Sequence, residues 1–185
     1  MASNNAKLGI GYASGMFYHA PAGTHLPNYP TEALGQEWKE VGDIAADGIT
    51  LNTDKTTSVI RNWANEVKRV IQTEHTETIA ATIMDTTQEV FETILGEGKT
   101  TVVEADQTHG KLIKASITQG SLPDPEAYLF IMKDGDDCIA IGTENGQITA
   151  MGAVTFAPGD TIKWVPTITA MNDGWQIILD DGQTT

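Results

Sequence analysis

Glycine-containing turn dipeptides recur in the last third of the chain, and each one separates two segments of strand-like sequence. Asp134-Gly135 and Asn145-Gly146 are hairpin signals, and the second favours a type I′ turn, in which both central residues need positive φ. Apolar residues recur at every second position in the segments that follow: Ile148, Ala150, Gly152, Val154 and Phe156, and later Ile162, Trp164, Ile168 and Ala170. This spacing predicts an antiparallel meander from about Glu126 to Gly182.

Each predicted strand has one apolar face, so the sheet must cover a core on one side. Further strand-like segments precede the meander at Trp38–Val41, Ile49–Asn52, Thr100–Ala105 and Leu112–Ile117. Two antiparallel sheets packed face to face, as a β-sandwich or barrel, are the economical way to bury these faces. Pro166 cannot donate a ladder hydrogen bond, so its strand is expected at a sheet edge or with a bulge.

One segment has helical periodicity. Thr86 stands three residues before Glu89, which is a capping-box pattern. One apolar face follows at helical spacing, formed by Val90, Phe91, Ile94 and Leu95. Gly96 suits the position just after the helix end. The sequence therefore predicts one α-helix near residues 87–95, lying flat on a sheet.

The N-terminal part of the chain is irregular, because glycines and prolines interrupt residues 1–36. A strand is expected within Leu8–Tyr18, followed by an extended arm that could order on a neighbouring subunit. We expect a single domain, with residues 1–36 as N-terminal strand and arm and residues 37–185 as the β-sandwich.

The region between the arm and the helix mixes turn and strand signals. Asp47-Gly48 predicts a tight turn, and the polar run Thr53–Ser58 predicts a loop. Ile60–Trp63 is expected to be a short strand or turn. Val67–Met84 is the longest strand-like stretch, and its first half is polar on both faces. Such a strand is expected to reach past its own core, either to another subunit or as a solvated hairpin.

Charge excludes several classes of partner. The chain has 25 acidic and 11 basic residues, for a formal net charge of −14. Such a surface repels phosphate, so tight binding to nucleic acid or to an anionic membrane is not expected. No apolar run approaches the ~18 residues of a membrane span, and we expect no signal peptide. The single cysteine, Cys138, can form no intrachain disulfide, which fits a reducing compartment.

No constellation of residues predicts catalysis, a cofactor or a metal site. Gly9, Gly11 and Ser14 form a broken dinucleotide fingerprint, without the strand before it and the helix after it that such a site needs. The four histidines are scattered. The acidic turn Asp134–Asp137 lacks the length and the bidentate glutamate of a calcium loop. The sequence gives no positive support for an enzyme, and a paired-carboxylate hydrolase stays an open alternative.

The order of elements in the first half of the chain resembles that of the major tail tube proteins of long-tailed, siphovirus-type bacteriophages. The shared features are Trp38–Ile49, the Thr/Asp-rich Leu51–Ser58, Ile60–Trp63, the strand with Thr76-Glu77-Thr78, and the helix opening Thr86–Val90. The resemblance covers roughly residues 37–170 and rests on order and spacing.

This resemblance implies a β-sandwich with a flanking helix, with six copies in a ring and rings stacked into a tube that conducts DNA during genome ejection. A long loop at about residues 43–64 and the N-terminal arm would bridge rings, and no C-terminal immunoglobulin-like domain is expected. The implied candidates for assembly contacts are Trp38, Asp47, Ile49, Thr56, Ile60, Trp63 and His75.

The implied partners are other copies of the chain and the tail tip, tape measure and tail terminator proteins. Double-stranded DNA would pass without specific binding, sliding along acidic residues that line the bore. The implied location is the virion, with the host cytoplasm during assembly. Two alternatives keep the same fold: a tube protein of a contractile injection or secretion system, and a β-sandwich module that binds a sugar or peptide.

Overall fold

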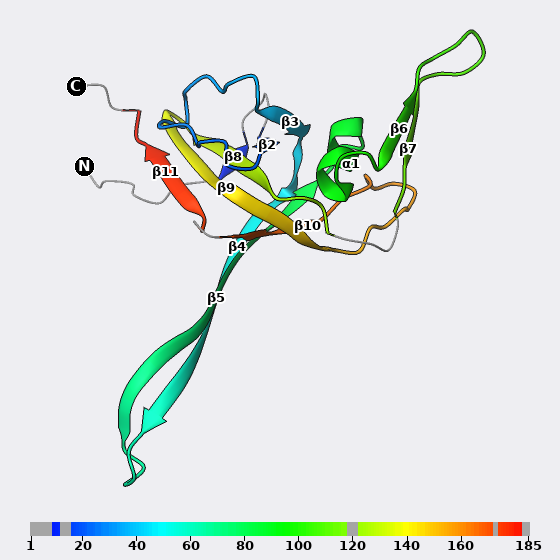
Figure 1. The fold of residues 1–185 in the computed structure, drawn as a ribbon. Helices are drawn as coiled ribbons and strands as arrows, with labels where there is room; N and C mark the ends of the chain where they lie inside the picture. The colour runs from blue at the N-terminus through cyan, green and yellow to red at the C-terminus, as the bar shows by residue number, and fades with distance from the viewer. Residues whose placement is uncertain (1–8, 12–15, 118–121, 172–173, 183–185) are drawn as a thin grey trace.

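A curved antiparallel sheet with one long projecting hairpin dominates the computed structural model, which describes residues 9–11, 16–117, 122–171 and 174–182 (Figure 1). The strands are β1 (Ile10–Gly11), β2 (Phe17–Pro21), β3 (Lys39–Gly42), β4 (Ile44–Arg61), β5 (Val67–Ile83), β6 (Thr100–Val103), β7 (Leu112–Ala115), β8 (Glu126–Asp134), β9 (Asp137–Met151), β10 (Pro166–Ala170) and β11 (Gln176–Asp180). The helix found in the described residues is α1 (Gln88–Leu95). The predicted mostly-β fold with one flanking helix is confirmed.

Nine strands form one sheet in the order β3-β2-β8-β9-β10-β5-β4, with β1 also on β8 and β11 also on β9, while β6 and β7 pair separately. Strand β9 belongs to two layers. Its first half pairs with β8 and β11, and its second half pairs with β10. We call β3-β2-β8-β9-β11 the first half-sheet and β9-β10-β5-β4 the second half-sheet. The two packed layers of the predicted sandwich are thus joined through one long shared strand.

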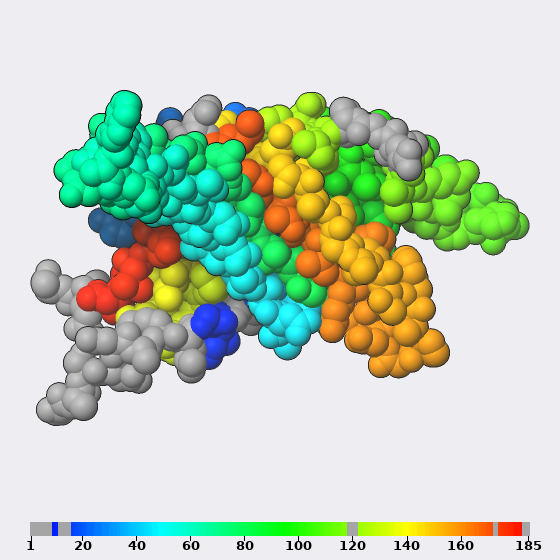
Figure 2. Space-filling view, turned by 90° about the horizontal axis from the view of Figure 1, so that it is seen from below, coloured from blue at the N-terminus to red at the C-terminus, as the bar shows by residue number. Residues whose placement is uncertain are grey.

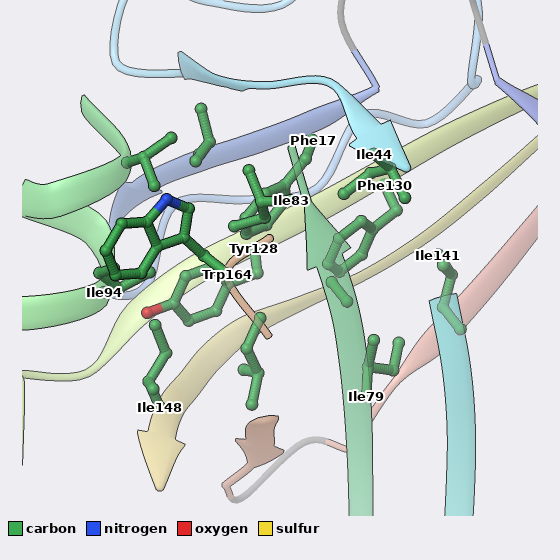
Figure 3. Close-up of a cluster of buried hydrophobic side chains, with 14 residues drawn as sticks. Phe17, Ile44, Ile79, Ile83, Ile94, Tyr128, Phe130, Ile141, Ile148 and Trp164 are labelled. Carbon is green, nitrogen blue, oxygen red and sulfur yellow. The ribbon is translucent and has the colours of Figure 1, made fainter. Parts of the chain in front are cut away.

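The main core lies between the two half-sheets (Figure 3). Phe17 of β2 stacks on Phe130 of β8, with ring centroids 4.4 Å apart. Ile79 of β5 and Ile168 of β10 face them from the second half-sheet, and both are fully buried. Helix α1 closes one end, where Trp164 joins the same cluster. Burial of these large side chains is the main stabilising term of the fold.

A second, smaller cluster lies on the opposite face of the first half-sheet. It contains Trp38, Leu129 and Ala140, and the segment at residues 22–38 covers it with Leu26 and Leu34. This part of the predicted extended N-terminal connection therefore packs along the subunit's own sheet.

The start of the chain also enters the main core. The strand expected within Leu8–Tyr18 is described as β1 and β2, while Leu8 and residues 12–15 lie outside the described residues. Strand β2 lies between β3 and β8, and Phe17 is fully buried. Residues before position 37 thus contribute to both hydrophobic clusters.

Helix α1 begins and ends close to where its pattern predicts. Thr87 is the N-cap, and its Oγ1 accepts a hydrogen bond from the Val90 backbone N–H at 3.3 Å. Gly96 follows the helix with φ of 91°, a conformation that favours glycine. The predicted capping residue, Thr86, instead accepts a hydrogen bond from the Trp164 indole N–H at 3.1 Å. The helix start is therefore tied to the core next to its cap.

We expect Thr87→Ala to lower the free energy of unfolding by about 1 kcal/mol, because a helix donor loses its capping acceptor. Urea unfolding followed by circular dichroism measures this change. Thr57→Ala is the matched control, since Thr57 lies exposed on the projecting hairpin. Equal unfolding midpoints for the two variants would argue against a stabilising cap.

The predicted turn at Asn145-Gly146 is wrong, because β9 runs through both residues. A Cβ on Gly146 would lie 2.9 Å from Tyr128 Cδ2 and 3.0 Å from Ile168 Cγ2. Glycine is therefore needed for close packing between the half-sheets rather than for positive φ.

The predicted turn at Asp47-Gly48 and the predicted loop at Thr53–Ser58 are also wrong, since both lie within β4. Gly48 does have φ of 71°, but it sits in a bulge where the β4–β5 register shifts. Thr53–Ser58 pairs along β5, with a second register shift at Thr56/Thr57 and a third at Ile60/Arg61. The loop implied at residues 43–64 is thus mostly strand.

Several other predictions are confirmed. Asp134-Gly135 turns the chain between β8 and β9, with φ of 64° at Gly135. The long strand-like stretch from Val67 is β5, and it does reach past the core. The strands predicted at Thr100–Ala105 and Leu112–Ile117 appear as β6 and β7, and β11 is the last strand of the predicted meander. Pro166 is the first residue of β10. The register between β10 and β9 shifts between Thr167 and Ile168, which is the bulge that the sequence predicted as one alternative for this strand.

Candidate assembly surfaces

The distal parts of β4 and β5 leave the body as a two-stranded projection, which we call the arm (residues 53–77; Figure 1). Neither hydrophobic cluster contains a residue of the arm. Nine strand residues, from Thr53 to Arg61, make the arm about 30 Å long at ~3.3 Å per residue. An isolated hairpin of this kind is only marginally stable in water, so the arm is suited to being covered by another surface.

The arm ends in an ordered turn. The Asn62 backbone N–H donates to Glu66 O at 3.0 Å, and the Glu66 backbone N–H donates to Asn62 Oδ1 at 2.8 Å. Asn65 takes φ of 62°, which asparagine tolerates better than most residues. Arg61 Nη1 donates to the Asn65 carbonyl oxygen at 2.9 Å. This turn presents Trp63, whose side chain is fully exposed at 105%.

The distal arm is apolar and basic. Four aliphatic side chains on it are about half exposed, at 45–57%: Val59, Ile60, Val67 and Val70. Residues 55–73 carry four basic side chains, Lys55, Arg61, Lys68 and Arg69, against one acid, Glu66, for a net charge of +3. Hydrogen bonds from Lys68 and Asn62 hold the pKa of Glu66 below its usual range. A basic segment stands out in a chain of net charge −14.

The structure gathers most of the residues implied as assembly contacts on the arm. Four lie on it: Thr56, Ile60, Trp63 and His75. Asp47 and Ile49 lie at its base, where Asp47 Oδ2 is 3.5 Å from Lys163 Nζ. Trp38 lies elsewhere, only 9% exposed in the second cluster.

Two strand edges of the second half-sheet are open in the described residues, and sequence patterns gave no sign of either. One is the outer side of β4 along its 18 residues. The other is β9 after Gly146, where its pairing with β8 ends while its pairing with β10 continues to Met151. An open edge presents unpaired N–H and C=O groups, which can pair with another chain.

One face of the second half-sheet carries threonines that are exposed or half-buried, and we call it the threonine face: Thr50, Thr78, Thr149, Thr167 and Thr169. Figure 2 shows parts of β4, β5, β10 and β9 side by side on the surface seen from below. The Thr149 and Thr169 hydroxyl oxygens lie 2.7 Å apart. The core and α1 lie on the opposite face of this half-sheet.

A cavity of 390 Å³ opens where β2, β3, the end of α1 and the start of β8 meet. We call it the acidic cavity, because its lining includes Glu37, Glu97, Asp124 and Glu126 against one lysine, Lys39. His19 also lines it and is 7% exposed, with Nδ1 3.0 Å from Glu126 Oε2. His19 Nε2 has no hydrogen-bond partner in the described part of the chain. These residues come from four segments, so no local pattern could reveal the cavity.

No group of three or more His, Cys, Asp or Glu side chains in the described ranges is placed to hold a metal ion. No helix among the described residues is long and apolar enough to cross a membrane. Cys138 is buried in the second cluster, and burial raises the pKa of its thiol.

We expect Cys138 in the folded protein to react slowly with a thiol reagent at pH 8, because a raised pKa leaves less of the reactive thiolate. The reaction rate should increase with pH, and this increase should occur at higher pH than it does for a free cysteine. Ellman's reagent gives the rate directly, and the urea-unfolded chain is the control. Equal rates for the folded and unfolded chains would mean that the thiol is accessible.

The sequence model of a family described as "Phage tail tube protein" matches residues 1–179. No curated protein matches the chain significantly.

Solved structures give similarities of low identity. A chain in the virion of a native gene transfer agent particle shares 8% identity with a TM-score of 0.43, covering 80% of this chain and 92% of that one. A chain in the tail of an empty gene transfer agent particle with C6 symmetry shares 7% identity with a TM-score of 0.43, covering 85% and 90%. A chain of the anti-feeding prophage tube-terminating cap shares 13% identity with a TM-score of 0.40, covering 100% of both.

The family match spans nearly the whole chain, and the arm, open edges and mostly-β body are consistent with it. A tail tube protein is a structural component of the virion tail and not an enzyme. On this match the chain belongs to the phage tail tube protein family.

Proposed function

We propose that six copies of this chain close into a ring and that rings stack into a tail tube that conducts double-stranded DNA during genome ejection. The observation that carries this proposal is the pair of open edges on the second half-sheet, β4 at one end and the second half of β9 at the other. Pairing the part of β4 that lies in the body of one copy with the second half of β9 of the next copy would join the two rows of backbone groups along the shorter edge. Closing the ring in this way covers both edges within the body, which reduces the liability of an open strand.

The same pairing determines which face of the second half-sheet points into the bore and which points outward. One face of the second half-sheet carries the core, α1 and the first half-sheet, so it is too bulky to point into a narrow bore. The threonine face is exposed or half-buried and would line the bore. Its hydroxyls carry no charge, so phosphate would meet neither fixed cations nor a strong repulsive field. We therefore expect neutral hydroxyls on this face, where the sequence suggested acids.

Electron microscopy of the purified protein at high concentration tests the proposal. Hollow rings or tubes with sixfold averages are expected. A protein that stays monomeric even with tail-tip components would overturn it. A sheath that contracts around native tubes would instead favour a contractile injection or secretion system. The tail tip, tape measure and tail terminator proteins are the proposed partners, and assembly in the host cytoplasm is proposed with them.

We expect Thr167→Lys, on β10 between the two open edges, to leave tube assembly intact but to slow genome ejection, because a ring of ammonium groups in the bore would bind phosphate. Ejection triggered in vitro and followed by a DNA-binding dye measures the rate. Thr101→Lys, on exposed β6, is the charge-matched control. Ejection at the wild-type rate by Thr167→Lys particles would argue against the threonine face as the bore surface.

A further inference from the structure

The tip of the arm has the properties of a surface that binds in a pocket of another molecule. Trp63 is fully exposed on a turn that is held by five backbone and side-chain hydrogen bonds. Tryptophan and arginine are enriched among the residues that dominate binding energy, and they act from within pockets on the partner. A preformed turn also loses little conformational freedom on docking. The tip is therefore built to insert into another surface.

We propose that the tip of one copy inserts Trp63 into the acidic cavity of a copy in the neighbouring ring. This contact rests on the proposed stacking of rings and adds to it the identity of the receiving site. The occupant is a second copy of this chain.

Charge complementarity favours this pairing. Residues 55–73 have a net charge of +3, and Asp54, Glu74 and Glu77 nearer the body balance it over the whole arm, so the basic character belongs to the part toward the tip. The lining of the acidic cavity has four carboxylates and one lysine, a net charge of −3 with His19 neutral. Three of these carboxylates, on Glu37, Glu97 and Asp124, are exposed, where they can meet an arriving cation. Opposite potentials steer two such surfaces together and set their register.

The chemistry of the cavity suits an indole flanked by basic side chains. Its volume of 390 Å³ lies within the range of cavities that enclose small organic ligands. Three prolines, Pro21, Pro123 and Pro125, supply flat apolar walls. His19 lines the cavity from its buried side, where its Nε2 atom has no contact with the open space of the cavity.

The acidic cavity that receives the tip must belong to another copy of the chain. The arm points away from the body (Figure 1), and no residue of the arm lines the acidic cavity. Two other cavities are weaker candidates. The one beside α1, of 220 Å³, is lined by Lys99 and by no acid. The one at the arm base, of 260 Å³, has a single acid, Asp47, which already pairs with Lys163.

Cysteine cross-linking tests the contact in assembled tubes. In a chain carrying both Ala64→Cys, next to Trp63, and Gln36→Cys, in the lining of the acidic cavity, a short bifunctional maleimide should produce a ladder of covalent multimers. Chains with either cysteine alone should give none, and Cys138 is buried and stays in place. The control pair Ala64→Cys with Glu104→Cys places the second cysteine on an exposed residue outside the cavity. Tubes that form but show no ladder, or equal ladders with both pairs, would overturn the proposal and leave the proposed function standing.

Charge reversal provides an independent readout. Lys68→Glu and Glu97→Lys should each raise the protein concentration needed for assembly, by roughly tenfold if repulsion replaces attraction at the contact. The double variant should return close to the wild-type concentration. Lys114→Glu, on exposed β7, controls for the change in net charge. Additive losses in the double variant would overturn the pairing. If the wild-type chain forms no tubes at all, the proposed function fails and this contact fails with it.

Discussion

Replacing residues 54–76 with Asn-Gly should give a chain that folds normally and remains monomeric. Thr53 and Glu77 are direct partners across the β4–β5 ladder. A two-residue type I′ turn can join such a pair without disturbing the strands. The core should not be affected, because neither hydrophobic cluster includes a residue of the arm.

Assembly, by contrast, should be lost. The deletion removes Trp63, the four basic residues of the distal arm, and half of the open β4 edge. Sedimentation velocity at high protein concentration measures the monomer, and circular dichroism on heating measures its stability. The matched control keeps the arm's length but replaces Thr73 and Thr76, two exposed polar residues, with serine. Tubes formed by the armless chain would refute an essential role for the arm. An unfolded product would show that the arm supports the fold.

Phe17→Ala should cause the largest loss of stability, about 3–5 kcal/mol, as expected for removing a fully buried phenylalanine. Phe17 stacks on Phe130 at 4.4 Å and lies 6.1 Å from the Tyr128 ring. Truncation therefore leaves a cavity among aromatic rings at the centre of the first half-sheet. A loss this large is a substantial fraction of the total stability of most domains. Urea unfolding at equilibrium measures it.

Phe156→Ala is the matched control, because Phe156 is 72% exposed and its loss should change stability by less than about 0.5 kcal/mol. Deleting residues 1–36 extends the test. If residues 1–36 were the separable N-terminal arm expected from the sequence, this deletion would weaken stacking more than folding, whereas the position of β2 inside the sheet leads us to expect an unfolded product. A cooperatively folded product with weaker stacking would support a separable N-terminal arm.

Local sequence signals succeeded where the determining contacts are also local. The cap, apolar face and terminal glycine of α1 all lie within ten residues, and the β8–β9 turn depends on Asp134-Gly135 alone. They failed where a distant contact decides. Asn145-Gly146 has a turn composition, but Tyr128 and Ile168 require a residue without a side chain at that point.

The candidate assembly surfaces also divide into those that the sequence located and those that depend on contacts between distant segments. The resemblance in element order placed Trp63 and Ile60 in the long loop at about residues 43–64, and in the structure both lie on the arm. The polar run Thr53–Ser58 was predicted to be a loop, because a strand that is exposed to solvent on both faces shows no alternation of hydrophobic and polar residues. The acidic cavity and the open half of β9 exist only after segments far apart in sequence have come together.

The register shifts at Thr56/Thr57 and Ile60/Arg61 have a mechanical consequence. A bulge interrupts the ladder and lets a strand bend locally. Each arm therefore has two positions between its base and its tip at which it can bend. If arms connect successive rings, the connectors on the outside of a curved tail can straighten while those on the inside bend further. A tube made of rigid rings would then curve as a whole while every tip stays seated.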